Sequence, residues 1–282
     1  MKNKYNVTVT QMVSCASVEQ NVTQANILLS EIMKDASVDL IVFPENFLSF
    51  GSSNLIESAL EIQGYIPGFC EFARKHRVNI VLGTIPFRDA KRSKSTKVVS
   101  RSLVINQVGL VVNHYDKLHL FDVDVGGVQG QYLESDNYIP GDAISVTALG
   151  RLKMGLSICY DVRFPTLYQK LVERGVNTLI LPSAFTEKTG KAHWEVLLRA
   201  RAIETQCFLL ASNQGGVHEN GLETWGHSMI ISPWGEVIAQ CNNGVGFCSV
   251  EIDLAEVYLT RKSMPVMSHK RNSIYCSTES GS

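Results

Sequence analysis

Short apolar runs recur along this chain and alternate with segments of helical periodicity, which leaves few architectures open to it. Asp39–Phe43 (DLIVF) and Asn79–Ile85 (NIVLGTI) are nearly uninterrupted apolar runs, typical of strands buried on both faces of a sheet. Ahead of them, Asn21–Met33 places its apolar residues at the spacing of an amphipathic helix. Strands and helices that alternate in this way predict an α/β fold.

The other segments predict mixed rather than purely parallel sheets. Val98–Ile105 and Leu110–Tyr115 flank a turn and predict a β-hairpin. No linker rich in Pro, Gly or Ser interrupts the chain, so we expect one domain over residues 1–275 and a polar tail at 276–282. Further strands are predicted at Lys4–Met12, Leu152–Ile158, Thr178–Leu181, Cys207–Ser212, Gly226–Ile231, Val237–Cys241 and Gly246–Ile252, and helices at Pro67–Lys75, Phe164–Arg174 and His193–Thr205.

Charge and composition favour a globular protein and argue against nucleic-acid binding. The 282 residues carry 26 basic and 27 acidic side chains, without the basic excess usual in nucleic-acid-binding proteins. Residues 1–11 lack the apolar stretch of a signal peptide, and no run approaches the roughly 20 apolar residues of a membrane span. Seven scattered cysteines form no CxxC pair and suit reduced thiols. We expect a cytoplasmic protein with no nucleic-acid or membrane partner, no metal and no cofactor.

Three reactive residues follow predicted strands and are candidate catalytic groups. Glu45 follows Asp39–Phe43, at the strand end where α/β sheets place site residues, and could act as a general base. Lys117 follows the predicted hairpin, and an ammonium there could stabilise negative charge on a reacting carbonyl oxygen. Cys159 lies between a buried strand and a helix that Pro165 would open, where backbone N–H groups favour a reactive thiolate.

Each of these residues alone also fits an ordinary structural role. Glu45 could cap the next element, Lys117 could be a surface lysine, and Cys159 could be a small buried apolar side chain. A Cys-His dyad is a further alternative, with His119 or His193 as the base.

Taken together, the three segments resemble a known family. PEN at 44–46, DKLHLFD at 116–122 and CYDVRFP at 159–165, in that order, are similar to the Glu-Lys-Cys motifs of the nitrilase superfamily of carbon–nitrogen hydrolases. The longer blocks at 182–208 and 226–237 resemble its Nit-type branch, the deaminated glutathione amidases. The resemblance implies a four-layer α-β-β-α sandwich that packs outer helices into a homodimer or larger homo-oligomer.

The resemblance also implies a role for each matched residue. Cys159 is the nucleophile, Glu45 the general base, and Lys117 with the Tyr160 backbone N–H stabilises the oxyanion. Glu134, six residues before Pro140, corresponds to a second glutamate that orients the lysine or the substrate.

The Nit-type likeness implies a small 2-oxo acid amide, such as deaminated glutathione, as the substrate. Candidate substrate contacts are Arg163, Thr189, His193 and Trp194. Arg163 also fits a structural role, and the helical spacing of the apolar residues from His193 onward also fits simple packing. The chain departs from the family motif at Thr166, where a glutamate is usual, which leaves Arg163 less constrained. The alternatives are an ω-amidase acting on 2-oxoglutaramate, another nitrilase-family hydrolase, or a scaffold without activity.

Overall fold

The computed structural model describes residues 2–35, 37–88, 95–124, 126, 130–271 and 274, and the tail predicted at 276–282 lies outside them. The strands are β1 (Lys4–Met12), β2 (Leu40–Val42), β3 (Asn79–Phe87), β4 (Val99–Ile105), β5 (Val111–Asp116), β6 (Asp122–Asp124), β7 (Gln131–Leu133), β8 (Val146–Leu149), β9 (Leu152–Leu156), β10 (Thr178–Ser183), β11 (Phe208–Val217), β12 (Glu223–Trp225), β13 (Met229–Ile231), β14 (Val237–Gln240) and β15 (Gly246–Asp253).

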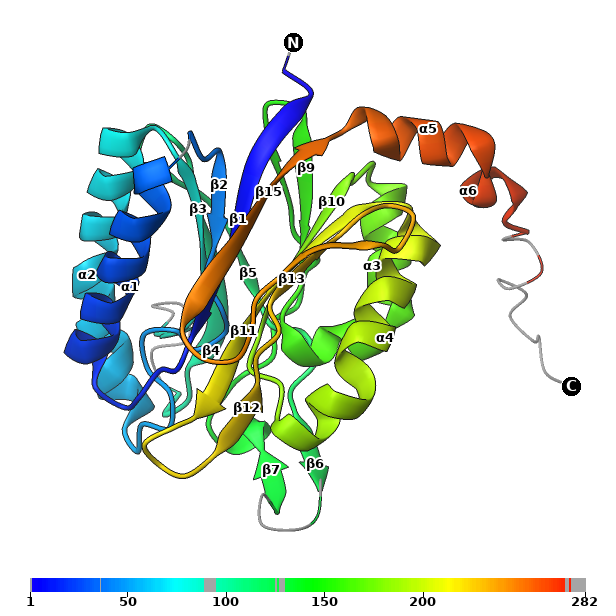
Figure 1. Cartoon of the computed structure of the whole chain (residues 1–282). Helices are drawn as coiled ribbons and strands as arrows, with labels where there is room; N and C mark the ends of the chain where they lie inside the picture. The colour runs from blue at the N-terminus through cyan, green and yellow to red at the C-terminus, as the bar shows by residue number, and fades with distance from the viewer. Residues whose placement is uncertain are drawn as a thin grey trace, which may run out of the picture.

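The helices lie outside the layers of strands (Figure 1). They are α1 (Val18–Asp35), α2 (Leu55–His76), α3 (Pro165–Glu173), α4 (Glu187–Thr205), α5 (Ala255–Ser263) and α6 (Val266–His269), with the short 3₁₀ helices η3 (Glu134–Asp136) and η4 (Cys159–Arg163). Among the described residues, no helix has the length and apolar character needed to cross a membrane.

The strands form two packed layers between two layers of helices. Helices α1 and α2 cover one side and α3 and α4 the other (Figure 1). The strand order is β5-β4-β3-β2-β1-β11-β10-β9-β8, and the parallel pair β1–β11, with Gln11 opposite Asn213, joins the two halves. Hairpins such as β4–β5 add antiparallel pairs. The four-layer α-β-β-α sandwich with mixed sheets is therefore confirmed.

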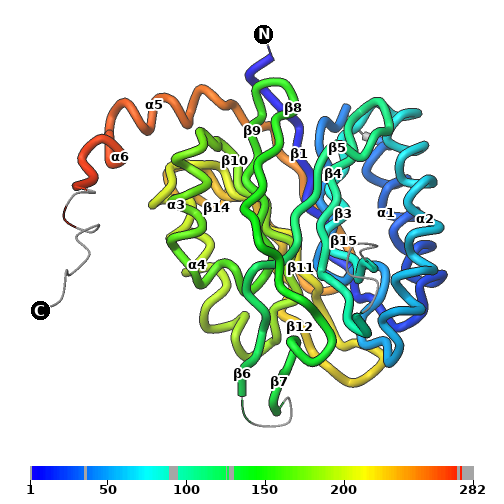
Figure 2. The backbone as a smooth tube through the Cα atoms, turned by 180° about the vertical axis from the view of Figure 1, so that it is seen from behind, coloured from blue at the N-terminus to red at the C-terminus, as the bar shows by residue number. Residues whose placement is uncertain are grey.

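The two halves also approach each other at their outer strands. Figure 2 shows β5 close to β8 on the far side of the molecule. Asn113 of β5 donates to Val146 O at 3.1 Å and to Thr147 Oγ1 at 2.7 Å. These contacts bring two edges of the sheet together and leave fewer edge groups exposed.

The buried strands divide their side chains between two apolar cores. In β2, Ile41 packs in the core that includes Leu29 of α1, whereas Leu40 and Val42 face the core that includes Leu209 of β11. All three β2 side chains are fully buried. Since successive side chains of a strand point to opposite faces, both faces of β2 are covered. The uninterrupted apolar run of Asp39–Phe43 is the sequence signal of this double burial.

The helix predicted at Pro67–Lys75 is correct in type but begins twelve residues earlier, at the start of α2. Asn54 caps the helix there, because its side chain accepts a hydrogen bond from Glu57 N at 3.2 Å. The early turns bury Ile62, and Pro67 lies inside the helix. The cap and this burial outweigh the loss of one backbone hydrogen bond at the proline.

Helix α4 also begins earlier than the predicted His193–Thr205. Thr186 caps it by accepting a hydrogen bond from Thr189 N at 3.3 Å, so the helix includes a first turn that the apolar spacing did not reveal. Strands β6, β7, β8 and β12 were not predicted, since each has only three or four residues and lacks the continuous apolar run that reveals a strand as short as β2.

Candidate active site

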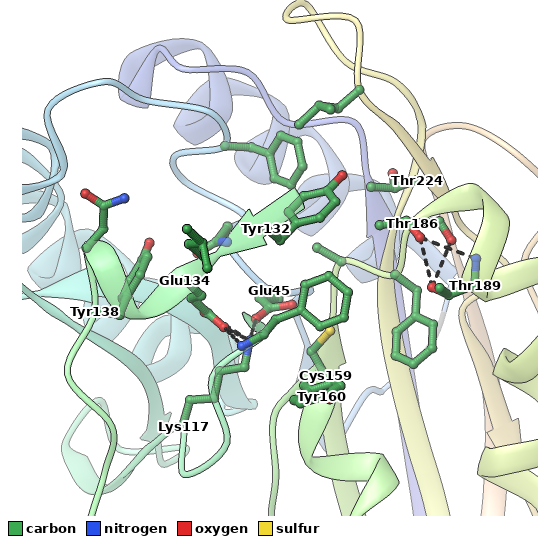
Figure 3. A pocket seen from close by; sticks show the side chains of 18 of the residues that line it. Glu45, Lys117, Tyr132, Glu134, Tyr138, Cys159, Tyr160, Thr186, Thr189 and Thr224 are labelled. Carbon is green, nitrogen blue, oxygen red and sulfur yellow. Dashed lines mark hydrogen bonds and ion pairs between the residues drawn. The ribbon is translucent and has the colours of Figure 1, made fainter. Parts of the chain in front are cut away.

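A cavity of about 350 Å³ brings all the predicted catalytic residues together. Glu45, Lys117, Glu134, Cys159 and Tyr160 contribute to its wall. Figure 3 shows the Lys117 ammonium between the carboxylates of Glu45 and Glu134, with the Cys159 sulfur on the side of Glu45. The size is within the usual range of small-molecule sites.

Backbone contacts from three segments hold Glu45 in this wall. Its amide donates to Ser183 O at 3.3 Å, and its carbonyl accepts from Gln214 Nε2 at 3.0 Å. The next residue, Asn46, has φ of 54°, and its amide donates to Thr84 Oγ1 at 2.9 Å. Glu45 is only 3% exposed, so its carboxylate acts in a largely water-free setting.

Lys117 is a buried cation that follows β5 directly. Its Nζ donates to Glu45 Oε1 at 2.8 Å and to Glu134 Oε2 at 2.9 Å. Burial alone would lower the pKa of Lys117, but the charges of Glu134 and Glu45 outweigh it and raise this pKa well above its usual value. The lysine is therefore a permanent ammonium at neutral pH.

Glu134 comes from η3, far from Glu45 in the sequence. Its Oε2 also accepts a hydrogen bond from Phe121 N at 2.6 Å, which fixes the carboxylate beside Lys117. Burial raises the pKa of Glu134, Lys117 acts in the opposite direction, and the negative charge of Glu45 raises it further. The result is one ammonium shared by two carboxylates.

Cys159 follows β9 and begins η4 with φ of 44°, a left-handed conformation that is strained for a residue other than glycine. Burial first, and then the negative charge of Glu45, raise the pKa of the thiol well above its usual value, although Lys117 opposes this. A backbone hydrogen bond at Ala184 lowers this pKa, in the expected direction, but burial has the larger effect. The resting group is a neutral thiol, which needs a base to become a nucleophile.

Of the predicted substrate contacts, Arg163 and Thr189 line the cavity. The Arg163 guanidinium lies 5.8 Å from the Tyr160 ring centre and 5.6 Å from that of Phe185. Within the described part of the chain, Arg163 forms no ion pair with a carboxylate. A cation held by aromatic faces at a cavity wall is available to an anionic ligand.

His193 and Trp194 are not among the residues that line the cavity. His193 is exposed, and its Nδ1 lies 3.2 Å from an Arg163 nitrogen, so it contacts a lining residue from outside. Trp194 is 1% exposed, packs on Phe185 and donates its Nε1–H to His227 O at 2.8 Å. The structure therefore places neither residue in the cavity wall, because His193 faces solvent and the face of α4 that carries Trp194 packs into the core.

The alternative of a Cys-His dyad finds no matching geometry among the described residues. Neither His119 nor His193 lines the cavity. His119 Nδ1 lies 2.6 Å from Asp161 Oδ1, and its ring stacks on Phe164 at 3.6 Å. Among the described residues, three or more His, Cys, Asp or Glu side chains never gather in a form that could hold a metal ion.

The cavity also uses residues that no motif singled out. Phe50, Tyr132, Thr186 and Thr224 belong to its wall and come from four separate segments. Thr186 follows the predicted strand Thr178–Leu181, so the strand-end argument could have identified it. The other three lie near irregular or very short elements that have no periodic signal.

Comparison with known proteins gives the context for this geometry. Residues 6–262 match the family model described as carbon-nitrogen hydrolase. The chain is 37% identical over 276 residues to the deaminated glutathione amidase of Yersinia enterocolitica, covering 96% of this chain and 94% of that protein. It is 38% identical over 276 residues to the rat protein of the same name, covering 95% and 83%.

Solved structures agree with these sequence relatives. The C. elegans NitFhit protein superposes with a TM-score of 0.88 at 36% identity, covering 99% of this chain and 69% of that chain. Saccharomyces cerevisiae Nit3, described as a member of branch 10 of the nitrilase superfamily, gives 0.85 at 26% identity, covering 96% and 97%. With its fold, its cavity and these matches, the chain belongs to the carbon-nitrogen hydrolase family of the nitrilase superfamily.

Proposed function

We propose that this carbon-nitrogen hydrolase is a cysteine-dependent amidase that cleaves a small 2-oxo acid amide of the deaminated glutathione type through a thioester. The observation that carries the proposal is the Lys117 ammonium, held by Glu45 and Glu134 in the same cavity as the neutral Cys159 thiol. A nucleophile, a base and a fixed cation are the groups that amide hydrolysis requires.

In the first half-reaction, the Glu45 carboxylate takes the thiol proton while the Cys159 sulfur attacks the amide carbonyl carbon. The new C–S bond moves the C=O electron pair onto oxygen, where Lys117 and the Tyr160 backbone N–H donate hydrogen bonds. Collapse of this intermediate breaks the C–N bond, and Glu45 passes its proton to the departing nitrogen. Ammonia or an amine leaves, and the acyl group remains as a thioester.

In the second half-reaction, water replaces the departed amine. The water oxygen attacks the thioester carbonyl carbon while Glu45 takes a proton from the water, and Lys117 again stabilises the oxyanion. The C–S bond then breaks, the sulfur recovers the proton from Glu45, and the carboxylic acid is released. The enzyme returns to its starting charge, so one glutamate serves both steps.

Substrate recognition is assigned to Arg163 and Thr189, which line the same cavity. The guanidinium can pair with the substrate carboxylate through two parallel hydrogen bonds, and the Thr189 hydroxyl can donate to a carboxylate or oxo oxygen. The deaminated glutathione amidases at 37% and 38% identity support this substrate class. The arrangement also admits 2-oxoglutaramate, which has the same 2-oxo acid end.

The test is ammonia or amine release from four compounds: deaminated glutathione, 2-oxoglutaramate, a simple aliphatic amide and a nitrile. Turnover of a 2-oxo amide is expected, abolished in Cys159→Ala and retained in Cys207→Ala, a buried cysteine outside the cavity. Arg163→Lys should raise KM about tenfold, since one ammonium cannot reproduce the paired hydrogen bonds. A preference for 2-oxoglutaramate would favour an ω-amidase, and no hydrolysis of any of the four compounds would favour a scaffold without activity.

A further inference from the structure

Asp161 is a fully buried carboxylate that takes no part in the reaction proposed above. It lies two residues after Cys159 and is 0% exposed. Its Oδ2 accepts hydrogen bonds from Ile158 N at 2.8 Å and from the Tyr115 hydroxyl at 2.8 Å. Its Oδ1 accepts from His119 N at 3.1 Å and from His119 Nδ1 at 2.6 Å. Four donors thus satisfy a charge that would otherwise be costly to bury.

The partners of Asp161 flank two catalytic residues at once. Tyr115 and His119 lie two residues before and two residues after Lys117, whereas Ile158 immediately precedes Cys159. The lysine follows β5 in one half of the sheet and the cysteine follows β9 in the other. The carboxylate therefore joins two segments that the strand pairing alone does not connect.

The four groups that donate hydrogen bonds to Asp161 cannot readily become acceptors. Burial first, and then the charge of Asp161, raise the pKa of the Tyr115 hydroxyl, so it keeps its proton and donates it. The backbone amides of Ile158 and His119 can only donate. A carboxylate can only accept, which places the His119 proton on Nδ1. The cluster is a complete and directional set of hydrogen bonds.

We propose that Asp161 is a positioning residue that ties the Lys117 segment to the Cys159 turn and so sets the distance between the ammonium and the sulfur. The simpler view is that Asp161 only caps η4 through Ile158 N. That role would not require the two contacts on either side of Lys117. The proposal rests on the proposed function, because it gives Lys117 its role at the reacting carbonyl.

Losing the hydrogen bonds between Asp161 and the Lys117 segment should change where the Lys117 ammonium lies. Lys117 is also held by Glu45 and Glu134, so without the tether it follows these carboxylates rather than the sulfur. Cys159 then loses part of the positive charge that opposes the rise of its pKa. Thiolate formation and stabilisation of the oxyanion should both weaken. The Arg163 guanidinium does not take part in the hydrogen bonds of Tyr115, so substrate binding should change little when Tyr115 is replaced.

The experiment compares Tyr115→Phe and Asp161→Asn with the matched control Tyr168→Phe. Tyr168 is equally buried and donates its hydroxyl to Ser157 Oγ at 3.0 Å, and among the described residues no hydrogen bond joins it to residues 115–119. For Tyr115→Phe, kcat is expected to fall roughly 10- to 100-fold with KM within about threefold of the parent, because small misplacements of catalytic groups are costly. Tyr168→Phe should keep kcat within about threefold. Equal kcat values for these two tyrosine variants would overturn the proposal.

A second readout needs no substrate: the rate at which iodoacetamide alkylates Cys159 at one mildly alkaline pH. Tyr115→Phe and Asp161→Asn should slow it, and Tyr168→Phe should not. In a Lys117→Ala background, Tyr115→Phe should cause no further slowing, since its effect acts through the lysine. The same slowing in both backgrounds would show a merely structural role and overturn the proposal. If circular dichroism shows that Asp161→Asn does not fold, the Tyr115→Phe variant alone still tests the proposal.

The two proposals fail in different ways. If no amide is hydrolysed by the parent enzyme, the proposed function is wrong, and the alkylation rates still measure the tether between Asp161 and Lys117. If amides are hydrolysed and Tyr115→Phe behaves as Tyr168→Phe does in both assays, only the positioning role is wrong.

Discussion

Lys117 determines the charge of the site, because its single ammonium faces the carboxylates of both Glu45 and Glu134. Removing a buried cation shared in this way costs more than breaking a surface ion pair, since it leaves two buried carboxylates without a neutralising charge. Its charge also opposes the rise of the Cys159 pKa. The residue thus affects both the thiol and the oxyanion.

Replacing Lys117 by alanine tests both effects. We expect kcat of Lys117→Ala to fall by roughly 100- to 1000-fold or more, the usual cost of losing an oxyanion donor. Because the ammonium lowers the pKa of Cys159, its loss should raise that pKa further. The pH at which iodoacetamide alkylation accelerates should therefore move upward.

Lys97 provides the control for this change, since its ammonium donates to Ser135 O at 2.7 Å outside the cavity wall. Lys97→Ala should leave kcat and the alkylation profile close to those of the parent. A Lys117→Ala enzyme with normal turnover would exclude the oxyanion role.

At the scale of elements, the position of Glu45 depends on how closely β3 passes the end of β2. A Cβ added at Gly83 would lie 1.9 Å from Pro44 O and 2.3 Å from Phe43 O, so only glycine allows this approach. The β3–β4 register shifts between Leu82 and Ile85, which places Gly83 in an irregular part of the strand. Packing between two strands thus sets the backbone that carries the base.

Gly83→Ala should therefore damage both stability and catalysis. The added methyl group must push back the Pro44 carbonyl, which we expect to cost about 1–3 kcal/mol in the free energy of unfolding by urea. Since Glu45 follows directly, kcat should fall at least about tenfold. The control is Gly64→Ala in α2, where the new Cβ meets no atom within 4 Å and should stabilise the helix by about 0.5–1 kcal/mol. Equal stabilities of the two variants would contradict this account.

For the whole molecule, the homo-oligomer expected from the family resemblance stays a prediction. Outward-facing apolar side chains on the outer helices fit it: Val196 on α4 is 69% exposed and Tyr258 on α5 is 65% exposed. Exposed apolar surface of this kind is typical of a protein interface. The expected partner is a second copy of the chain, packed through these helices.

Light scattering after size exclusion checks this prediction. The parent protein should have at least twice the 31.2 kDa mass of one chain. Val196→Glu should shift it toward the monomer, because a charge would be buried at the interface. Ile27→Glu, at a comparably exposed position of α1 (58%), should leave the mass unchanged. A monomeric parent would rule out the dimer.

The sequence by itself predicted the parts that depend on neighbours along the chain. Lys4–Met12 coincides with β1 because alternation is a local property, and Pro165 opens α3 as its fixed φ favours. Where long-range contacts compete, the sequence was less informative. Pro67 suggested a helix start, yet it lies inside α2 because packing and the Asn54 cap extend the helix before it.

The active-site residues show the same difference between local and long-range information. Glu45, Lys117 and Cys159 could be named in advance because each lies in a short contiguous motif that resembles a known family. The fold was needed to show that Glu134, expected to orient the lysine or the substrate, hydrogen-bonds to Lys117, that Trp194 is buried in the core, and that burial raises the pKa of Cys159. Burial and electrostatic potential at one atom are sums over groups from distant segments, and folding alone brings those groups together.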